Sequence, residues 1–291
     1  MLKTNNPQTS HYSDAVKLFH RHFDCAGRHS DPEFLKSIVL HFSALPYENL
    51  SKIVKHHDFE DTTEKIRLPD EVMHDHAEFG LGGTCFALTF FLQSILEYNG
   101  FACYPVMADM RYGPNTHSAL VVILNNKKLL VDPGYLLNNP LELQEQGARV
   151  HQTDVQGIEL HYLADERIYE LYTFNREGVK WRYRFKDQPI PQADFIALWK
   201  SSFSWNGMRG LVLTKNEKDR MVYAHKTFMR ETSWQGKKNF NIKQNYHQRI
   251  RETFGIDPAY TERALAALES NLERDRKLGL WVPKHLRNQS E

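Results

Sequence analysis

The 291-residue chain contains 41% hydrophobic and 25% charged residues, a composition typical of globular proteins. Its formal net charge of +1 gives no electrostatic reason to expect binding to nucleic acid or to an acidic membrane surface. Three scattered cysteines are too few for a disulfide framework or a cysteine-rich metal site, and they indicate free thiols in a reducing compartment.

The start of the chain gives no sign of a targeting segment. Residues 1–6 are not followed by an apolar core, so no signal peptide is expected, and no apolar run approaches the length needed to cross a membrane. The length fits one large domain or two to three small ones. We therefore expect a cytoplasmic protein.

The first third of the sequence is predicted to be helical. Apolar residues recur at helical spacing over 13–23, where Ser13 is placed to cap the helix. Asp31 and Pro32 begin a clearer helix, because Asp is a common cap and Pro fits the first helical position. Pro46 ends it. The polar stretch 51–80 is expected to form helix pieces and loops.

The middle of the chain changes to strand patterns. An apolar, β-branched run at 116–124 is followed by the turn dipeptide Asn125-Asn126 and a second strand at 127–132, which predicts a hairpin. Further strands are expected at 101–107, 159–163, 169–174 and 180–185.

The last third is predicted to be mixed. A helix is expected at 194–199, another within 239–254, and a last one from Asp257-Pro258, with Leu265, Leu268 and Leu272 on one face. Strands are expected at 210–214, 220–225 and 226–230, and a polar, disordered tail at 281–291.

One stretch combines a tight turn with a possible nucleophile. Gly80-Leu81-Gly82-Gly83-Thr84 leads directly into Cys85, and an apolar helical run then continues to Asn99-Gly100. The N-terminus of a helix stabilises a thiolate over a thiol, and the thiolate is the form that attacks carbonyl carbons. This arrangement predicts a reactive Cys85.

A cysteine nucleophile also needs a base and a group that orients the base. If Asn125-Asn126 is a two-residue loop, Leu124 faces Lys127 and Asp132 faces Ala119. His117 then lies on the same face as Ala119, diagonally across from Asp132. Diagonal neighbours in a hairpin lie roughly 7–8 Å apart, within reach for an imidazole and a carboxylate. The sequence therefore predicts a Cys85–His117–Asp132 triad.

Each of these residues also has a structural interpretation. A lone intracellular cysteine is most often a small buried hydrophobic residue, which is what we expect of Cys25 and Cys103. His117 could be a buried strand histidine, and Asp132 could cap its own turn. Only the three together favour an active site.

Other motifs favour neither a metal nor a nucleotide. His74-Asp75-His76 lacks a third and a fourth ligand, so no metal is expected. The glycines before Cys85 lack the spacing of a dinucleotide or phosphate-binding loop.

These residues resemble the arylamine N-acetyltransferase family over roughly residues 13–275. The resemblance depends on sequence blocks that occur in the family's order: Leu45-Pro46-Tyr47-Glu48-Asn49-Leu50, Gly82-Gly83-Thr84-Cys85-Phe86, Thr116-His117, Val131-Asp132-Pro133-Gly134-Tyr135 and Phe254-Gly255-Ile256.

The resemblance implies an α+β fold with a cysteine-protease-like core. It divides into a helical bundle at 1–100 that contains the catalytic cysteine, a β-barrel at 101–205 that contains the histidine and the aspartate, and an α/β lid at 206–291.

It also implies an activity and roles for individual residues. Acetyl-CoA, a co-substrate and not a tightly bound cofactor, would acylate Cys85, with His117 as the base and Asp132 as its orienter. A small aromatic amine or hydrazine would then take the acetyl group in a ping-pong reaction. Tyr47 and Tyr135 match positions that line the acceptor pocket.

The chain departs from the family pattern around the cysteine. Leu81, Ala87 and Thr89 stand where the family has Arg, Glu and Asn. The family's Arg helps to hold the glutamate that corresponds to Glu48. Here another cation, a hydrogen-bond network or exposure of Glu48 must replace it, because an unpaired buried carboxylate is costly.

Three functions follow from this pattern. The first is acyl transfer from a CoA thioester to an amine. The second is a divergent amide synthase or amide hydrolase that uses the same triad with a different acyl donor. The third is a non-catalytic binding protein, whose signature would be the loss of a triad member, and all three residues are present.

Overall fold

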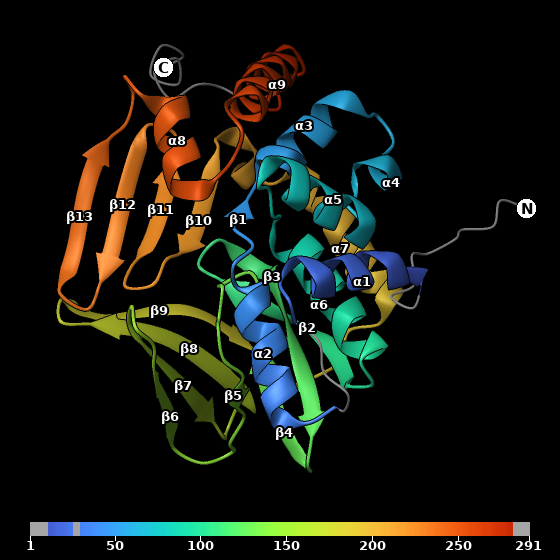
Figure 1. The fold of residues 1–291 in the computed structure, drawn as a ribbon, viewed down its shortest axis with the longest axis vertical. Helices are drawn as coiled ribbons and strands as arrows, with labels where there is room; N and C mark the ends of the chain where they lie inside the picture. The colour runs from blue at the N-terminus through green and yellow to red at the C-terminus, as the bar shows by residue number, and fades with distance from the viewer. Residues whose placement is uncertain (1–10, 26–29, 282–291) are drawn as a thin grey trace, which may run out of the picture.

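The computed structural model describes residues 11–25 and 30–281, and it combines helices with two antiparallel sheets (Figure 1). The predicted tail lies outside the described residues, apart from Trp281. In Figure 1 the helices of the first hundred residues lie on one side. The curled barrel strands lie below a second sheet, which is formed largely by the C-terminal part of the chain.

The helical part agrees with the sequence patterns. Its helices are α1 (Ser13–His22), α2 (Pro32–Phe42), α3 (Leu50–Asp58), α4 (Thr62–Lys65), α5 (Pro69–Phe79) and α6 (Cys85–Tyr98). Asp31 caps α2 as predicted, because its carboxylate accepts a hydrogen bond from the Phe34 N–H at 2.8 Å. The Ser13 prediction is wrong, since Ser13 lies inside α1 and its side chain makes no cap.

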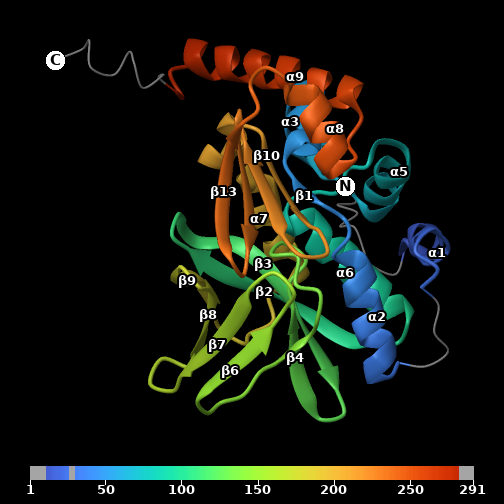
Figure 2. The ribbon, with the colours of Figure 1, turned by 60° about the vertical axis from the view of Figure 1, so that its left-hand side comes forward.

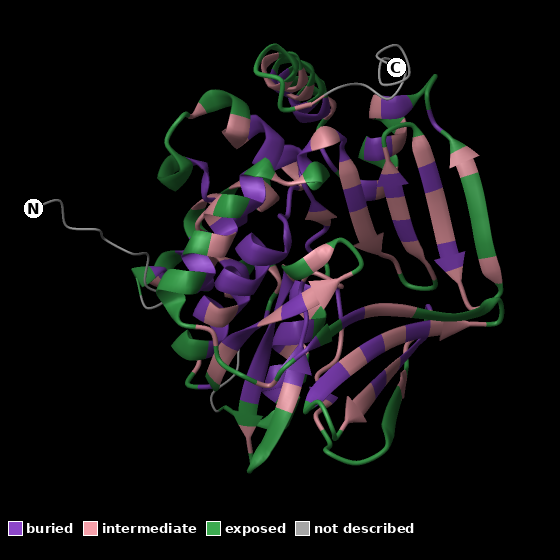
Figure 3. Ribbon diagram, turned by 180° about the vertical axis from the view of Figure 1, so that it is seen from behind, coloured by how far each residue is buried: buried purple, intermediate pink, exposed green. Residues whose placement is uncertain are grey.

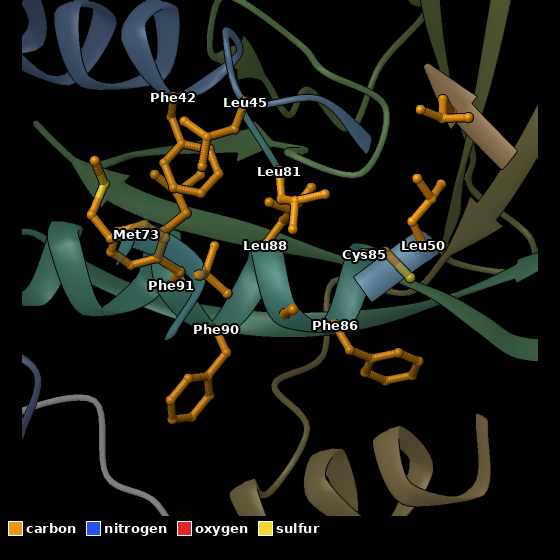
Figure 4. Close-up of a cluster of buried hydrophobic side chains, with 14 of the residues drawn as sticks. Phe42, Leu45, Leu50, Met73, Leu81, Cys85, Phe86, Leu88, Phe90 and Phe91 are labelled. Atoms are coloured by element: carbon orange, nitrogen blue, oxygen red, sulfur yellow. The ribbon is translucent and has the colours of Figure 1, made fainter. Parts of the chain in front are cut away.

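Helix α6 is the centre of this part. Every residue of its first two turns, from Cys85 to Leu92, is buried (Figure 3). The elements that pack around α6 must therefore also present apolar side chains to it. Figure 4 shows Leu81 against Leu88 of this helix, with Phe42, Leu45 and Met73 nearby. This packing fixes the position of Cys85 at the helix N-terminus.

The second layer is an eight-stranded sheet that curls into a barrel, in the order β5-β4-β3-β2-β9-β8-β7-β6. Asn125 and Asn126 both have positive φ, as a type I′ turn requires, and Leu124 pairs with Lys127. The predicted register is therefore confirmed. The strands are β2 (Ala102–Met110), β3 (Gly113–Leu124), β4 (Lys127–Val131), β5 (Leu141–Glu142), β6 (Ala148–Gln152), β7 (Gly157–Leu163), β8 (Ile168–Asn175) and β9 (Gly178–Phe185).

The third layer is a five-stranded sheet in the order β1-β10-β11-β12-β13, whose first strand, β1 (Tyr47–Glu48), comes from the helical part. Helix α9 lies across one end of it, next to α3 (Figure 2). The remaining elements are α7 (Gln192–Ser201), η2 (Ser202–Ser204), η3 (Asn206–Arg209), β10 (Val212–Asn216), β11 (Met221–His225), β12 (Phe228–Ser233), β13 (Gly236–Asn241), α8 (Tyr246–Phe254) and α9 (Pro258–Lys277).

The predicted apolar face of the last helix is correct only in part, since Leu268 is half-buried against the hydrophobic core. Leu265 is 38% exposed, whereas Ala264, Ala267 and Asn271 are buried. Small side chains let α9 approach α3 closely, and the Asn271 amide donates a hydrogen bond to the Ile53 carbonyl at 3.1 Å. Close helix packing therefore decides which face of α9 is buried, and leucine spacing does not.

Candidate active site

The turn before Cys85 is held against the segment that follows α2. Gly83 donates a backbone hydrogen bond to the Pro46 carbonyl, and Glu48 donates one to the Gly83 carbonyl. A side chain at Gly82 would overlap the Pro46 carbonyl oxygen, because its Cβ would lie only 1.8 Å away. The glycine is required by this close approach, which delivers Cys85 to the first position of α6.

His117 and Asp132 meet in the barrel as predicted. The His117 Nε2 lies 2.8 Å from Asp132 Oδ2, and both side chains are buried. Because an ionised carboxylate only accepts hydrogen bonds, Nε2 is the donor. Tyr183 also donates its hydroxyl to Oδ2 at 2.6 Å, and the Tyr135 N–H donates to Oδ1 at 3.0 Å. Asp132 is thus held by three donors.

The other ring nitrogen of His117 is free to donate a hydrogen bond to the Cys85 sulfur. The Cys85 side chain is buried, with 6% of its surface exposed. Burial opposes ionisation of the thiol, but the hydrogen bond from His117 and the positive charge on its ring outweigh it and lower the pKa of Cys85. Burial of Cys25 and Cys103 raises the pKa of both thiols instead. Cys85 alone among the three is placed to be a thiolate.

His117 is correspondingly held as a cation. Burial alone would lower its pKa, but the charge of Asp132, the hydrogen bond to it and the contact with Cys85 raise the pKa of His117 to about 10. The three residues therefore favour an ion pair between thiolate and imidazolium.

Gly134 lies where Cys85 and His117 approach each other. A Cβ at this position would lie 2.7 Å from His117 Cε1 and 2.8 Å from the Cys85 Cβ, both closer than real contacts allow. Any larger residue would therefore push the two reactive groups apart.

Tyr47 and Tyr135 both lie next to the cluster of Cys85, His117 and Asp132. The Tyr135 ring packs edge-on against His117, with centroids 5.1 Å apart. Tyr47, on β1, bridges to Gly83 and interacts electrostatically with both Cys85 and Tyr135. Burial raises the pKa of both phenols, so both remain neutral donors in this environment.

Arg67 replaces the cation that Leu81 does not supply. It is 3% exposed, and its guanidinium lies 3.4 Å from Glu48, which has no exposed surface. It also donates to Ser51 Oγ at 2.7 Å, to the Gly82 carbonyl at 2.6 Å and to Asp75 at 2.7 Å. Of the three alternatives for Glu48, a new cation and a hydrogen-bond network both apply, and exposure does not.

Thr89 and Ala87, the other two departures from the family pattern, also fit the packing around the turn before Cys85. Thr89 donates its hydroxyl to the Ser118 carbonyl at 3.1 Å and so ties α6 to the strand that contains His117. Ala87 lies against the turn, where a Cβ on Gly83 would come within 3.2 Å of its methyl group. A longer side chain at 87 would crowd this turn.

Lys52, a buried cation of α3 whose charge acts on the Cys85 thiol, was not expected from the sequence. Its Nζ donates to the carbonyl and the hydroxyl of Ser202 and lies 4.7 Å from the centre of the Phe203 ring. Burial lowers the pKa of Lys52 to about 8, and the Cys85 charge opposes this effect. Lys52 therefore adds positive potential at Cys85.

Tyr183 and Arg67 were missed as well. Tyr183 reaches Asp132 from β9, and no local pattern indicates that pairing. Arg67 did leave a signal, because it is an arginine between the apolar residues Ile66 and Leu68 in an otherwise polar stretch.

The remaining surfaces are less suited to chemistry. A hollow of about 490 Å³ beside Trp181 and Arg184 is lined by residues of β2, β3, β8 and β9 and by Arg111 of the β2–β3 turn, none of them from the Cys85 site. Within the described residues, no group of three or more His, Cys, Asp or Glu side chains could hold a metal ion. No helix in 11–25 or 30–281 is long and apolar enough to span a membrane.

A family model described as N-acetyltransferase matches residues 31–262, most of the chain. The chain belongs to the arylamine N-acetyltransferase family. It is therefore an N-acetyltransferase-like acyltransferase. No curated protein matches the chain.

Solved arylamine N-acetyltransferases share its fold. The enzyme from Mycobacterium abscessus is 18% identical with a TM-score of 0.76, covering 90% of this chain and 99% of its own. The Salmonella typhimurium enzyme is 18% identical with a TM-score of 0.71, covering 88% and 99%. The Nocardia farcinica enzyme is 17% identical with a TM-score of 0.72, covering 90% and 99%.

Proposed function

We propose that this N-acetyltransferase moves an acetyl group from acetyl-CoA to an arylamine, a hydrazine or a related amine through a thioester on Cys85. The observation that carries the proposal is the buried Cys85–His117–Asp132 arrangement, in which the pKa of the thiol is lowered and that of the imidazole is raised. Such an ion pair supplies a nucleophile at neutral pH without a separate deprotonation step.

In the first half-reaction the Cys85 thiolate attacks the thioester carbonyl carbon of acetyl-CoA. The bond between that carbon and the CoA sulfur then breaks, and the departing CoA thiolate takes the proton of the His117 imidazolium. Asp132 holds the ring in the orientation that this transfer needs, through the 2.8 Å hydrogen bond to Nε2. The products are acetyl-Cys85, neutral His117 and CoA.

In the second half-reaction the amine nitrogen attacks the acetyl-Cys85 carbonyl carbon. Neutral His117 accepts the N–H proton, the bond from carbon to the Cys85 sulfur breaks, and the ion pair forms again. Tyr47 and Tyr135 are the proposed walls of the acceptor pocket, because each interacts with the trio directly. CoA leaves before the amine reacts, which makes the mechanism ping-pong.

Transfer is favoured over hydrolysis by the burial of the site. Cys85, His117 and Asp132 are all buried, which limits the access of water to an acyl intermediate. We further propose that the five-stranded sheet with α8 and α9 acts as a lid over a cysteine-protease-like core formed by the helices and the barrel. The three-part division at residues 100 and 205 is part of the same proposal.

The experiment is intact mass measurement after incubation with acetyl-CoA and no acceptor. We expect an adduct of one acetyl group that is absent in Cys85→Ala and that disappears when an arylamine is added. Initial rates at several concentrations of both substrates should give parallel double-reciprocal lines. No adduct on a Cys85 that still reacts rapidly with iodoacetamide would exclude acetyl-CoA as donor and favour the amide synthase or hydrolase.

A further inference from the structure

A second hollow lies between helices α8 and α9 at the end of the five-stranded sheet, where Figure 2 shows the two helices side by side. Its volume is about 320 Å³, and we call it the α8 hollow. Leu211, Leu265 and Leu268 form its apolar side, and Leu265 is 38% exposed. A hollow of this size can hold a small organic molecule. The residues that line it are all separate from the Cys85 site.

The first turn of α8 forms one wall of the hollow and has no cap. Tyr246 and His247, the first two residues of the helix, line the hollow together with Lys243 and Gln244. Asn245 stands at the capping position, but its side chain makes no capping hydrogen bond within the described part of the chain, and the first turn contains no acidic residue. The free N–H groups and the helix dipole therefore give this wall a positive potential, which favours an anion.

The hydroxyl of Tyr246 independently points to a ligand. Tyr246 is 9% exposed, and its buried hydroxyl has no hydrogen-bond partner among the described residues. Burial raises the pKa of Tyr246 to about 12, so the hydroxyl keeps its proton and remains a donor. A buried donor without an acceptor is costly and rare in native proteins. An acceptor atom in the hollow that Tyr246 lines would satisfy it.

Two lysines add positive charge at the rim of the hollow. Lys243 precedes α8, and Lys226 belongs to the two-residue turn between β11 and β12. The Lys226 side chain lies beside Leu211, because a Cβ on the preceding residue, Gly210, would come within 3.0 Å of the Lys226 Cε. None of the described residues that line the hollow is acidic. The lining therefore combines hydrogen-bond donors and cations on one side with leucines on the other.

We propose that the α8 hollow binds a small amphipathic anion, with its charged group at the N-terminus of α8 and its apolar body against the three leucines. The charged group would accept hydrogen bonds from the Tyr246 hydroxyl and from first-turn N–H groups, and the two lysines would stabilise its charge. A carboxylate and a phosphate monoester share this chemistry, and the test separates them. The proposal does not depend on acyl transfer, because the hollow shares no residue with the Cys85 site.

The test is isothermal titration calorimetry with four probes. Octanoate and octyl phosphate are amphipathic anions, octanamide has the apolar body without the charge, and acetate has the charge without the apolar body. We expect octanoate or octyl phosphate to bind at least roughly tenfold more tightly than octanamide and acetate, because only they satisfy both sides of the hollow. The tighter of the two identifies the charged group. Absence of this preference would overturn the proposal.

Competition with CoA tests whether the site is separate from the donor site. Binding of the tighter anion should be unchanged in the presence of saturating CoA, because the lining residues of the hollow do not belong to the Cys85 site. Displacement of the anion by CoA would assign it to the donor site and would overturn the proposal.

Variants of the lining residues test the geometry. Tyr246→Phe should weaken binding of the tighter anion roughly tenfold, as loss of a hydrogen bond to a charged group does. Lys243→Gln should weaken it roughly threefold, because an exposed charge contributes less. Lys238→Gln is the control, since Lys238 is also exposed but lies on β13 outside the hollow. Unchanged affinity in Tyr246→Phe, or an equal effect of the two lysine variants, would overturn the proposal.

Thermal unfolding without a ligand gives a second readout. If the Tyr246 hydroxyl has no partner in the free protein, Tyr246→Phe removes an unsatisfied polar group and should keep or raise the Tm. A lowered Tm would show that the hydroxyl already has a partner and would overturn its assignment to a ligand. The tighter anion should raise the Tm of the wild type more than that of Tyr246→Phe, and equal shifts would contradict the role of the hydroxyl.

Discussion

Replacing Arg67 by Met is expected to destabilise the fold strongly. The substitution keeps most of the side-chain volume but removes every charged hydrogen bond of the guanidinium. Glu48 has no exposed surface and cannot be hydrated, and the Gly82 carbonyl loses its 2.6 Å donor. Asp75 is partly exposed and can recover water.

The size of the expected loss of stability follows from the hydrogen bonds that remain. Ser51 still donates its N–H and hydroxyl to Glu48, at 2.9 and 2.5 Å, so the carboxylate keeps two of its hydrogen bonds but loses its counter-ion. Removing one partner of a buried pair typically costs about 3–5 kcal/mol. For a domain of this size, this loss lowers the Tm by roughly 10 °C.

The assay is thermal unfolding of matched variants. Arg249→Met is the control, because Arg249 lies at the same 3.4 Å from Glu252 but both side chains are exposed, so its loss should cost less than about 1 kcal/mol. The double variant Arg67→Met/Glu48→Gln should regain much of the stability, since no unpaired charge remains. A loss in Arg67→Met no larger than in Arg249→Met, or a double variant as unstable as the sum of the two single ones, would refute the reasoning.

Three further predictions concern Cys85, His117 and the glycine beside them. His117→Gln should slow alkylation of Cys85 by iodoacetamide at neutral pH at least tenfold, because the thiolate loses its counter-ion. An unchanged rate would mean that another cation, such as Lys52, is sufficient to stabilise the thiolate. In a Cys85→Ala background, which removes the compensating proton of the thiol, stability should fall more steeply above pH 6.5 than in Cys85→Ala/His117→Gln, because Asp132 still raises the pKa of His117 and a raised pKa stabilises the folded state fully below 6.5 and progressively less above it; equal slopes in urea-unfolding series would contradict the raised pKa of His117. Gly134→Ala should strongly reduce the rate at which acetyl-CoA acylates Cys85 while it changes the Tm little, because the added methyl group separates Cys85 from His117. A normal acylation rate would show that the backbone can move aside.

Local rules were sufficient to predict the core of the site. The two-residue turn at Asn125-Asn126 sets the register of its hairpin, and the register brings His117 to Asp132. In the same way, the glycine turn and the apolar run predicted a helix that begins at Cys85. These features depend on neighbours in sequence, so they are visible without knowledge of the fold.

The supporting residues could not be predicted because their partners are distant in sequence. Tyr183 reaches Asp132 only after the barrel has curled, and Lys52 meets Ser202 only when η2 packs on α3. Strand β13 was missed because its polar sequence gains strand structure only by pairing with β12. Tertiary context decides such elements, and a single sequence does not contain it in readable form.

The hairpin also affects when the thiol becomes reactive as the chain folds. His117 and Asp132 are joined through a short loop, so their pairing needs little chain ordering. Cys85 meets them only after the turn at Gly82 has docked on Pro46 and α6 has packed against β2 and β3. We therefore expect the thiol to stay protonated and weakly reactive in partly folded chains. Such timing would protect newly made enzyme from oxidation and from premature acylation, and it would make thiolate reactivity a late marker of complete folding.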